Sequence, residues 1–156
     1  GDLLTSLLAS VVQFRVAPMI DAQLDLTPVD FVAKAINFIS CHQFEPSTYH
    51  LINPKMISWN RIVQLMRDYG YEIKSLEFHE WANLVQQRLA VDPGKIEKLF
   101  RAAGVNIHTS QNKTRFDCSM TARMLGQTNL NCDSAETLFS TYLDYLSRND
   151  IIPRVD

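Results

Sequence analysis

Two neighbouring side chains, those of Cys41 and His42, are of the types that nucleophilic catalysis uses. A cysteine attacks a carbonyl carbon as its thiolate, and it needs a base within hydrogen-bond reach of the sulfur. Residues adjacent in sequence at a helix end rarely point the same way, so we interpret this pair as structural. An autonomous Cys/His hydrolase is kept as one hypothesis, which predicts that alkylating the cysteines changes a measurable activity.

The possible metal ligands are spread too widely along the chain for a metal site. No two histidines have the i, i+4 or His-x-His spacing that places two imidazoles on one face. The cysteines are odd in number and include no Cys-x-x-Cys, which favours neither a disulfide framework nor a zinc knuckle. These residues are His42, His50, His79, His108, Cys41, Cys118 and Cys132. We therefore expect a reduced, cytoplasmic protein that binds no metal.

Two polar residues stand where the chain must turn. Asp30 follows Pro28 at the third position of a predicted helix, where a carboxylate satisfies free backbone amides and the positive end of the helix dipole. Asn53 precedes Pro54 at the end of a predicted strand, and this pair most simply fixes a turn. A substrate contact from Asn53 is the alternative, because loops after strand ends face the ligand crevice in open α/β sheets.

Helices and short strands must position these side chains. Apolar stripes and capping residues predict helices over Asp2–Val12, Thr27–Ser40, Ser58–Tyr69, His79–Leu89, Asp92–Ala103, Ser119–Leu125 and from Asp133 through Leu146. Alternation and β-branched or aromatic content predict strands over Leu24–Leu26, Ser47–Ile52 and Tyr71–Phe78. Capping boxes are expected from Thr27 with Asp30 and from Asp133 with Glu136. The polar run Val105–Thr114 predicts a mobile loop.

Length and composition limit the class of protein. At 156 residues, with 46% hydrophobic and 21% charged residues, the chain has globular composition, and we expect one domain over residues 1–156. A net charge of −2 predicts no nucleic-acid partner. The apolar runs are shorter than the about 20 residues that cross a bilayer, so no membrane contact is expected. The start at Gly1, without Met, suggests a fragment of a longer protein.

The predicted elements place the chain in the α+β class, predominantly helical with a few short strands. These strands are too few to build a complete parallel sheet. Leu24–Ile36 and Tyr49–Pro54 nevertheless form one strand–helix–strand unit of the kind that occurs late in nucleotide-binding α/β enzymes.

The order of the motifs carries a resemblance to a known family. After the unit Leu24–Ile36 with Tyr49–Pro54 come four further motifs, which are Ile57–Asn60, Tyr69–Tyr71, Glu80-Trp81 and the tail with Phe116–Ser119 and Leu138–Leu146. In this order they resemble the C-terminal portion of thioester reductase domains. Those domains belong to the extended short-chain dehydrogenase/reductase superfamily and terminate nonribosomal peptide synthetases, polyketide synthases and carboxylic acid reductases. The match spans nearly all of residues 2–153.

The resemblance implies an activity whose catalytic residues lie outside this chain. It implies NADPH-dependent release of a thioester, held on the phosphopantetheine arm of a carrier protein, as an aldehyde or alcohol. The family's nucleotide site needs a Gly-rich turn, and its chemistry needs a Tyr with Lys four residues later. The five glycines here are far apart, and no Tyr has Lys at that position. We therefore expect no catalytic residue and no cofactor site here, with NADPH bound by the parent enzyme.

Within this family the chain corresponds to a substrate-binding lobe that lacks the nucleotide-binding half. An acyl or pantetheine channel is walled by apolar and aromatic side chains with few polar groups. The candidate substrate-binding residues are Asn53, Trp59, Tyr71, Phe78 and Trp81. Core packing is the simpler interpretation of the four aromatic residues.

Two partners follow from the resemblance: the N-terminal Rossmann half of the parent reductase and a phosphopantetheinylated carrier protein. Basic residues on a predicted helix pair suit the acidic surface of carrier proteins, with a solvated helix face as the alternative. They are Arg88, Lys95, Lys98 and Arg101. The alternative function is a non-catalytic interaction module that docks a carrier or partner protein.

Overall fold

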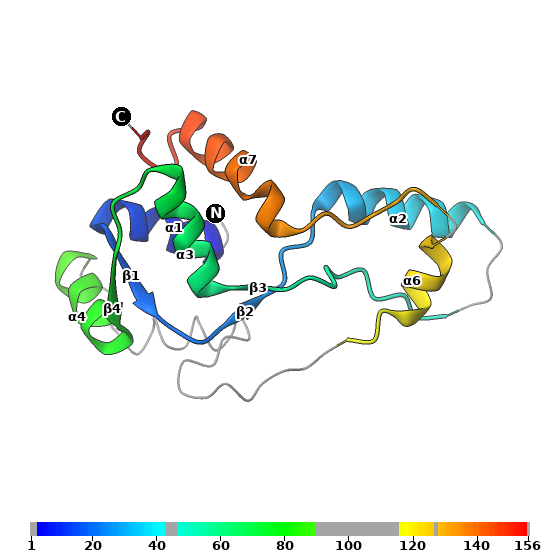
Figure 1. The fold of residues 1–156 in the computed structure, drawn as a ribbon, viewed down its shortest axis with the longest axis horizontal. Helices are drawn as coiled ribbons and strands as arrows, with labels where there is room; N and C mark the ends of the chain where they lie inside the picture. Colours follow the sequence, from blue (N-terminus) through cyan, green and yellow to red (C-terminus); the bar gives the residue numbers. More distant parts are fainter. Residues whose placement is uncertain (1–2, 43–46, 90–115, 127, 156) are drawn as a thin grey trace. The chain divides into compact units, whose positions relative to one another are not determined.

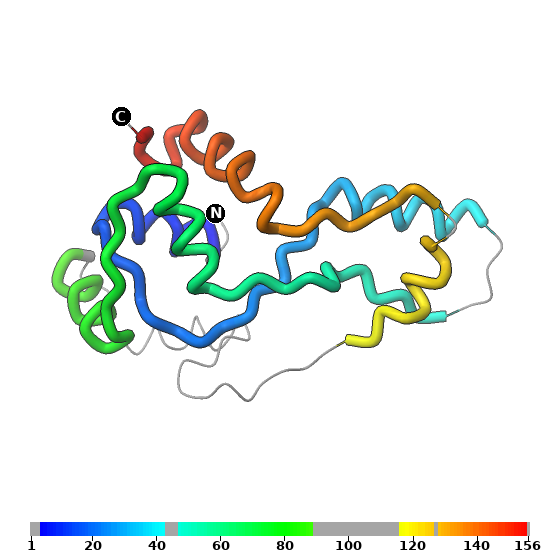
Figure 2. Tube along the Cα trace, in the orientation of Figure 1, coloured from blue at the N-terminus to red at the C-terminus, as the bar shows by residue number. Residues whose placement is uncertain are grey.

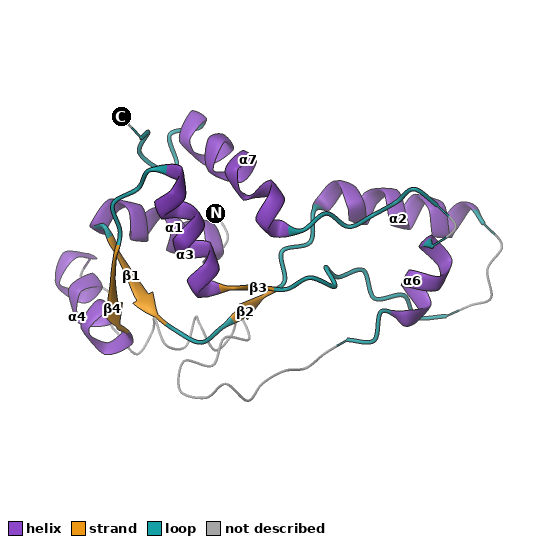
Figure 3. Ribbon diagram, viewed as in Figure 1, coloured by secondary structure: helices purple, strands orange, loops and turns teal. Residues whose placement is uncertain are grey.

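The computed structural model describes residues 3–42, 47–89, 116–126 and 128–155 (Figure 1). Its helices are α1 (Leu3–Phe14), α2 (Val29–Cys41), α3 (Trp59–Tyr69), α4 (Phe78–Leu89), α6 (Ser119–Leu125) and α7 (Ala135–Arg148). Its strands are short, as Figure 3 shows: β1 (Val16–Met19), β2 (Gln23–Leu24), β3 (Ile57–Ser58) and β4 (Lys74–Glu77). The mixed composition with helix in the majority confirms the sequence-based expectation.

Several sequence-based predictions lie outside the described residues. They are the helix over Asp92–Ala103, the loop over Val105–Thr114, and the basic residues Lys95, Lys98 and Arg101. None of the described helices is long and apolar enough to cross a membrane.

The chain divides into two compact units. The described residues of the first unit are 3–23, 58–89 and 139–155, and those of the second are 24–42, 47–57, 116–126 and 128–138. Each unit is built from segments far apart in sequence, so neither can form before distant parts of the chain have met. The expectation of a single domain stays a prediction, since two compact units can belong to one domain.

The first unit is organised around a parallel pair of strands. β1 pairs with β4, with Val16 opposite Lys74 and Met19 opposite Glu77, and α1 and α4 pack against these strands. The first three residues of β1 are buried, whereas β4 is largely exposed. The unit's buried apolar side chains come from all of its helices and include Leu8, Val11, Ile62, Met66, Val85, Phe139 and Leu143.

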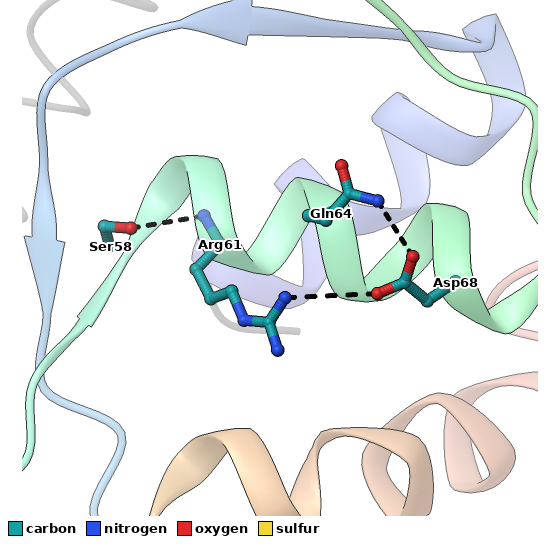
Figure 4. Close-up of polar contacts among 4 residues, drawn as sticks. All are labelled: Ser58, Arg61, Gln64 and Asp68. Atoms are coloured by element: carbon teal, nitrogen blue, oxygen red, sulfur yellow. Dashed lines mark hydrogen bonds and ion pairs between the residues drawn. The ribbon is translucent and has the colours of Figure 1, made fainter.

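Helix α3 begins and ends as its sequence predicts (Figure 4). The Oγ atom of Ser58 accepts a hydrogen bond from the backbone N–H of Arg61 at 3.2 Å, which satisfies one of the free amides of the first turn. On the exposed face Gln64 Nε2 donates to Asp68 Oδ1 at 2.8 Å, and Arg61 lies 4.0 Å from the same carboxylate. The helix ends at Gly70, whose φ of +121° is in the region that favours glycine.

We expect Gly70→Ala to lower the free energy of unfolding by about 1–3 kcal/mol. The positive φ strains any residue with a Cβ atom, and a Cβ built at this position lies 2.6 Å from Val155 Cγ1. Urea unfolding of the chain measures the loss. Adding Val155→Ala to Gly70→Ala removes the close contact but leaves the backbone strain, so the double variant should recover only part of the loss. Equal stability of Gly70→Ala and the parent chain would contradict this explanation.

The second unit has a small core between α2 and α6. Its buried residues are Phe31, Ala35 and Leu125, and partly buried hydrophobic side chains pack against them: Val32, Phe38, Leu51, Leu130 and Cys132. α2 begins after Pro28, as predicted, but no side chain caps it. The hydroxyl of Thr27 instead donates to Asp25 Oδ1 at 2.6 Å. The predicted capping box of Thr27 with Asp30 is therefore wrong.

The other predicted cap is shifted by one residue. Ser134 Oγ accepts from the backbone N–H of Glu136 at 3.1 Å, so Ser134 caps the start of α7 in the role predicted for Asp133. Asp30 lies in the first turn of α2 and pairs with Lys34 at 3.0 Å, and the hydrogen bond from Lys34 holds the pKa of Asp30 below its usual value. These contacts support its structural interpretation.

Two of the strand predictions differ from the structure. The strand predicted over Ser47–Ile52 is not formed in this chain, because these residues are neither helix nor strand, and the following strand is β3 at Ile57–Ser58, which pairs with β2. The strand β1 was not predicted. Pro18 lies in β1 and has no N–H to donate, so propensity argues against a strand there.

Candidate functional site

Asn53 joins three separate segments of the second unit. Its side-chain Nδ2 donates to the carbonyl oxygens of Leu26 at 3.1 Å and Asp133 at 2.9 Å. Its Oδ1 accepts from the backbone N–H of Lys55 at 2.9 Å, and its own N–H donates to Thr27 Oγ1 at 2.7 Å. The residue is 1% exposed. These contacts give Asn53 a structural role, and its predicted contact with substrate stays a prediction.

Trp59 is fixed at the start of α3 by two hydrogen bonds. The indole Nε1–H donates to the carbonyl oxygen of Pro18 in β1 at 2.8 Å, and the backbone N–H donates to the carbonyl oxygen of Ala22 at 2.9 Å. The side chain has no exposed surface. Trp59 therefore ties α3 to β1 and to the segment that follows β1.

The structure brings Phe78 and Trp81 together at the start of α4. Their ring centroids lie 5.9 Å apart, with Trp81 2% exposed and Phe78 half-buried. Because α4 packs against β1 and β4, this aromatic pair lies beside the parallel strands of the first unit. Of the four aromatic candidates, Phe78 has the most surface available for a ligand.

Tyr71 lies at another part of the first unit, against the C-terminal segment. Its hydroxyl donates to the carbonyl oxygen of Pro153 at 2.6 Å, and its ring stacks on that of Tyr69 with centroids 5.7 Å apart. Burial raises the pKa of Tyr71. The hydroxyl of Tyr69 donates to Asp144 Oδ1, and this hydrogen bond raises the pKa of Tyr69.

These raised values bear on which chemistry the two tyrosines perform. A tyrosine that delivers a proton near neutral pH works best when its pKa is lowered toward that pH. The pKa values of Tyr69 and Tyr71 are shifted in the opposite direction. Both phenols are therefore suited to holding α3 and α7 to the C-terminal segment.

Sequence reasoning did not identify a shallow pocket of the first unit. Its volume is about 330 Å³, and it is lined by Tyr69, Asp144, Ser147, Arg148, Arg154 and Val155. Arg148 lies in the last turn of α7, where a cation is favoured by the negative end of the helix dipole. The lining comes from the ends of α3 and α7 and from the tail, and no short motif would have grouped these residues.

The remaining reactive side chains are engaged locally. The Nδ1 atom of His42 lies 2.7 Å from the carbonyl oxygen of Phe38, and Cys41 Sγ donates to Asn37 Oδ1 at 3.6 Å. The two side chains contact different residues of the preceding turn, which supports their structural interpretation. Burial raises the pKa of Cys132, which disfavours its thiolate form. The described residues contain no group of three or more His, Cys, Asp or Glu able to hold a metal ion.

Comparison with known proteins shows similarity to the reductase domains of synthetases. The chain is 30% identical in sequence to the terminal R domain of the myxalamid PKS-NRPS biosynthetic pathway, and the match covers 99% of this chain and 40% of that one with a TM-score of 0.80. A thiolation-reductase di-domain from an archaeal nonribosomal peptide synthetase shares the fold, with a TM-score of 0.68 at 21% identity over 94% of this chain and 31% of the di-domain.

A curated protein gives the same result from sequence. A linear gramicidin synthase of Brevibacillus parabrevis is 28% identical over 153 residues, which are 94% of this chain and 3% of that protein. No family model matches the chain. The chain thus spans less than half of each solved relative and a small part of the synthase. The comparisons confirm the resemblance to the C-terminal portion of thioester reductase domains.

Proposed function

Starting from this similarity to terminal reductase domains, we propose that the chain is the substrate-binding C-terminal portion of an NADPH-dependent thioester reductase. In the complete enzyme it would help to release a carrier-bound acyl or peptidyl thioester as an aldehyde or alcohol. The match to the myxalamid R domain over 99% of the chain, at a TM-score of 0.80, carries the proposal. By itself the chain is expected to be inactive.

The residues of the first unit do not fit NADPH. A pyrophosphate is bound where a Gly-rich turn leads from a parallel strand into a helix N-terminus. Here β4 leads directly from Glu77 into α4 at Phe78, with no glycine between them, and Glu80 occupies the first turn. A carboxylate at that position repels the phosphates that the helix dipole would otherwise attract. In our proposal the nucleotide therefore binds to the other part of the reductase.

The role proposed for this chain is to hold the thioester. Side chains such as Phe78 and Trp81 supply apolar surface for the acyl chain or the pantetheine arm. Fixing the carbonyl carbon relative to the nicotinamide makes hydride transfer effectively intramolecular, and such positioning lowers the barrier without a catalytic group from this chain. Binding energy, rather than acid–base chemistry, is thus the contribution that we assign to the described residues.

Phe78→Ala tests this role in the complete reductase. We expect the KM for a carrier-bound acyl thioester to rise about 5- to 10-fold with kcat largely unchanged, because the variant loses apolar contact made equally in the ground and transition states. Initial rates of NADPH oxidation measure both constants. Val29→Ala is the matched control, since Val29 is 82% exposed and lies on α2, in the other unit. Unchanged constants in Phe78→Ala would remove Phe78 from the proposed binding surface.

A further inference from the structure

Residues 50–52 form a short segment with open backbone positions. His50, Leu51 and Ile52 are half-buried and belong to no helix or strand (Figure 2). The backbone N–H and C=O groups of Leu51 and Ile52 make no hydrogen bond to any other described residue. Backbone groups removed from water without a partner are unfavourable, and native structures pair nearly all of them.

The residues on either side of these groups are held firmly. The carbonyl oxygen of His50 accepts from Thr121 Oγ1 at 2.9 Å, and the imidazole Nδ1 lies 3.1 Å from the carbonyl oxygen of Asp117. At the other end Asn53 is bound to Thr27, and the Leu51 side chain packs in the core of the second unit. The segment is therefore positioned in advance, with its central backbone groups left open.

The residue types of this segment favour a strand. Tyr49, Leu51 and Ile52 are aromatic, apolar or β-branched, which suits a pleated, half-buried surface. A strand forms only when a second strand supplies hydrogen bonds, and a positioned segment with open backbone groups is a template for such pairing. The described strands pair among themselves, β1 with β4 and β2 with β3, so none of them serves this segment.

We propose that residues 50–52 pair as an edge strand with a strand from the nucleotide-binding part of the same reductase. This inference rests on the proposed function. The occupant follows from length: the chain covers 40% of the matched R domain, so 100% − 40% = 60% of that chain lies outside the match. A relative that is otherwise similar over 99% of this chain has that much additional polypeptide to supply the missing strand. A second copy of this chain is the competing occupant.

Amide hydrogen exchange tests the pairing directly. We expect the amides of Leu51 and Ile52 to exchange rapidly in this chain alone, and to be protected about tenfold or more in the complete reductase. The amides of Ile62 and Val63, inside α3, serve as internal controls that are protected in both samples. Equal, rapid exchange of Leu51 and Ile52 in the complete reductase would overturn the proposal. Protection that appears in the chain alone as its concentration rises would also overturn it, in favour of a second copy.

A pair of variants separates the backbone contribution from the side chain. Ile52→Pro and Ile52→Ala both remove the isoleucine side chain, but only proline also removes the N–H. With the nucleotide-binding part supplied as a separate protein, we expect Ile52→Pro to weaken its association with this chain at least tenfold more than Ile52→Ala does, as measured by calorimetry. Equal effects would overturn the pairing. Association and protection without any NADPH-dependent thioester reduction would instead contradict the proposed function and leave the pairing standing.

Discussion

Replacing Trp59 with alanine is expected to lower the free energy of unfolding by about 3–5 kcal/mol. The indole has no exposed surface and lies between α3 and β1, so its removal creates a cavity in the first unit. The variant also leaves the carbonyl oxygen of Pro18 without the 2.8 Å hydrogen bond that the indole donates. Urea unfolding followed by circular dichroism measures the loss.

Two further variants test the reason for this loss. Trp59→Phe keeps most of the ring volume and loses the N–H donor, so its cost should be smaller, about 1–3 kcal/mol. Val29→Ala shortens a side chain that is 82% exposed, and it should change stability by less than about 0.5 kcal/mol. If Trp59→Ala were no more destabilising than Val29→Ala, the packing of α3 on β1 would be described wrongly.

The second large effect is expected from Asn53→Asp, at roughly 3–5 kcal/mol of lost stability. The two side chains are nearly equal in size, so the change is one of hydrogen-bond chemistry. The Nδ2 group donates to the carbonyl oxygens of Leu26 and Asp133, and a carboxylate would place an oxygen against both of them. The residue is 1% exposed, so water does not compensate.

Asn83→Asp makes the same chemical change at an exposed position of α4. It should alter stability by less than about 0.5 kcal/mol. Thermal unfolding of both variants provides the comparison. A similar, small effect in Asn53→Asp and Asn83→Asp would contradict the structural role of Asn53.

Features specified by neighbouring residues could be predicted from the sequence. Ser58 before an apolar helical stripe and Gly70 after it predict both ends of α3, and the structure has them there. Ser119–Leu125 likewise forms the predicted short helix. Each of these signals acts within one or two helical turns, where hydrogen bonds and backbone dihedral preferences decide the structure.

Features that depend on distant partners could not be predicted. β1 pairs with β4, and Val16 and Lys74, its first pair, are 58 residues apart; Pro18 in β1 also disfavours a strand by propensity. Ser47–Ile52 has strand composition but no described strand beside it, so composition alone gave a wrong assignment. Propensity describes whether a segment suits a sheet, and a partner strand decides whether the sheet exists.

The candidate site shows the same limit. Phe78 and Trp81 are three residues apart at the start of one helix and meet as helical spacing predicts. Tyr71, which is near them in sequence, instead contacts Pro153 in the C-terminal segment. The aromatic cluster expected from sequence proximity is thus divided into two places in the first unit, while Asn53 belongs to the second.

The central claim is that this chain holds the thioester substrate while another part of the reductase binds NADPH. Its most direct test is NADPH oxidation with a carrier-bound acyl thioester, measured for this chain alone, for the nucleotide-binding part alone, and for the two joined in one polypeptide. We predict turnover only when both parts are present. Turnover by the nucleotide-binding part alone at the rate of the joined polypeptide, or by this chain alone, would contradict the claim.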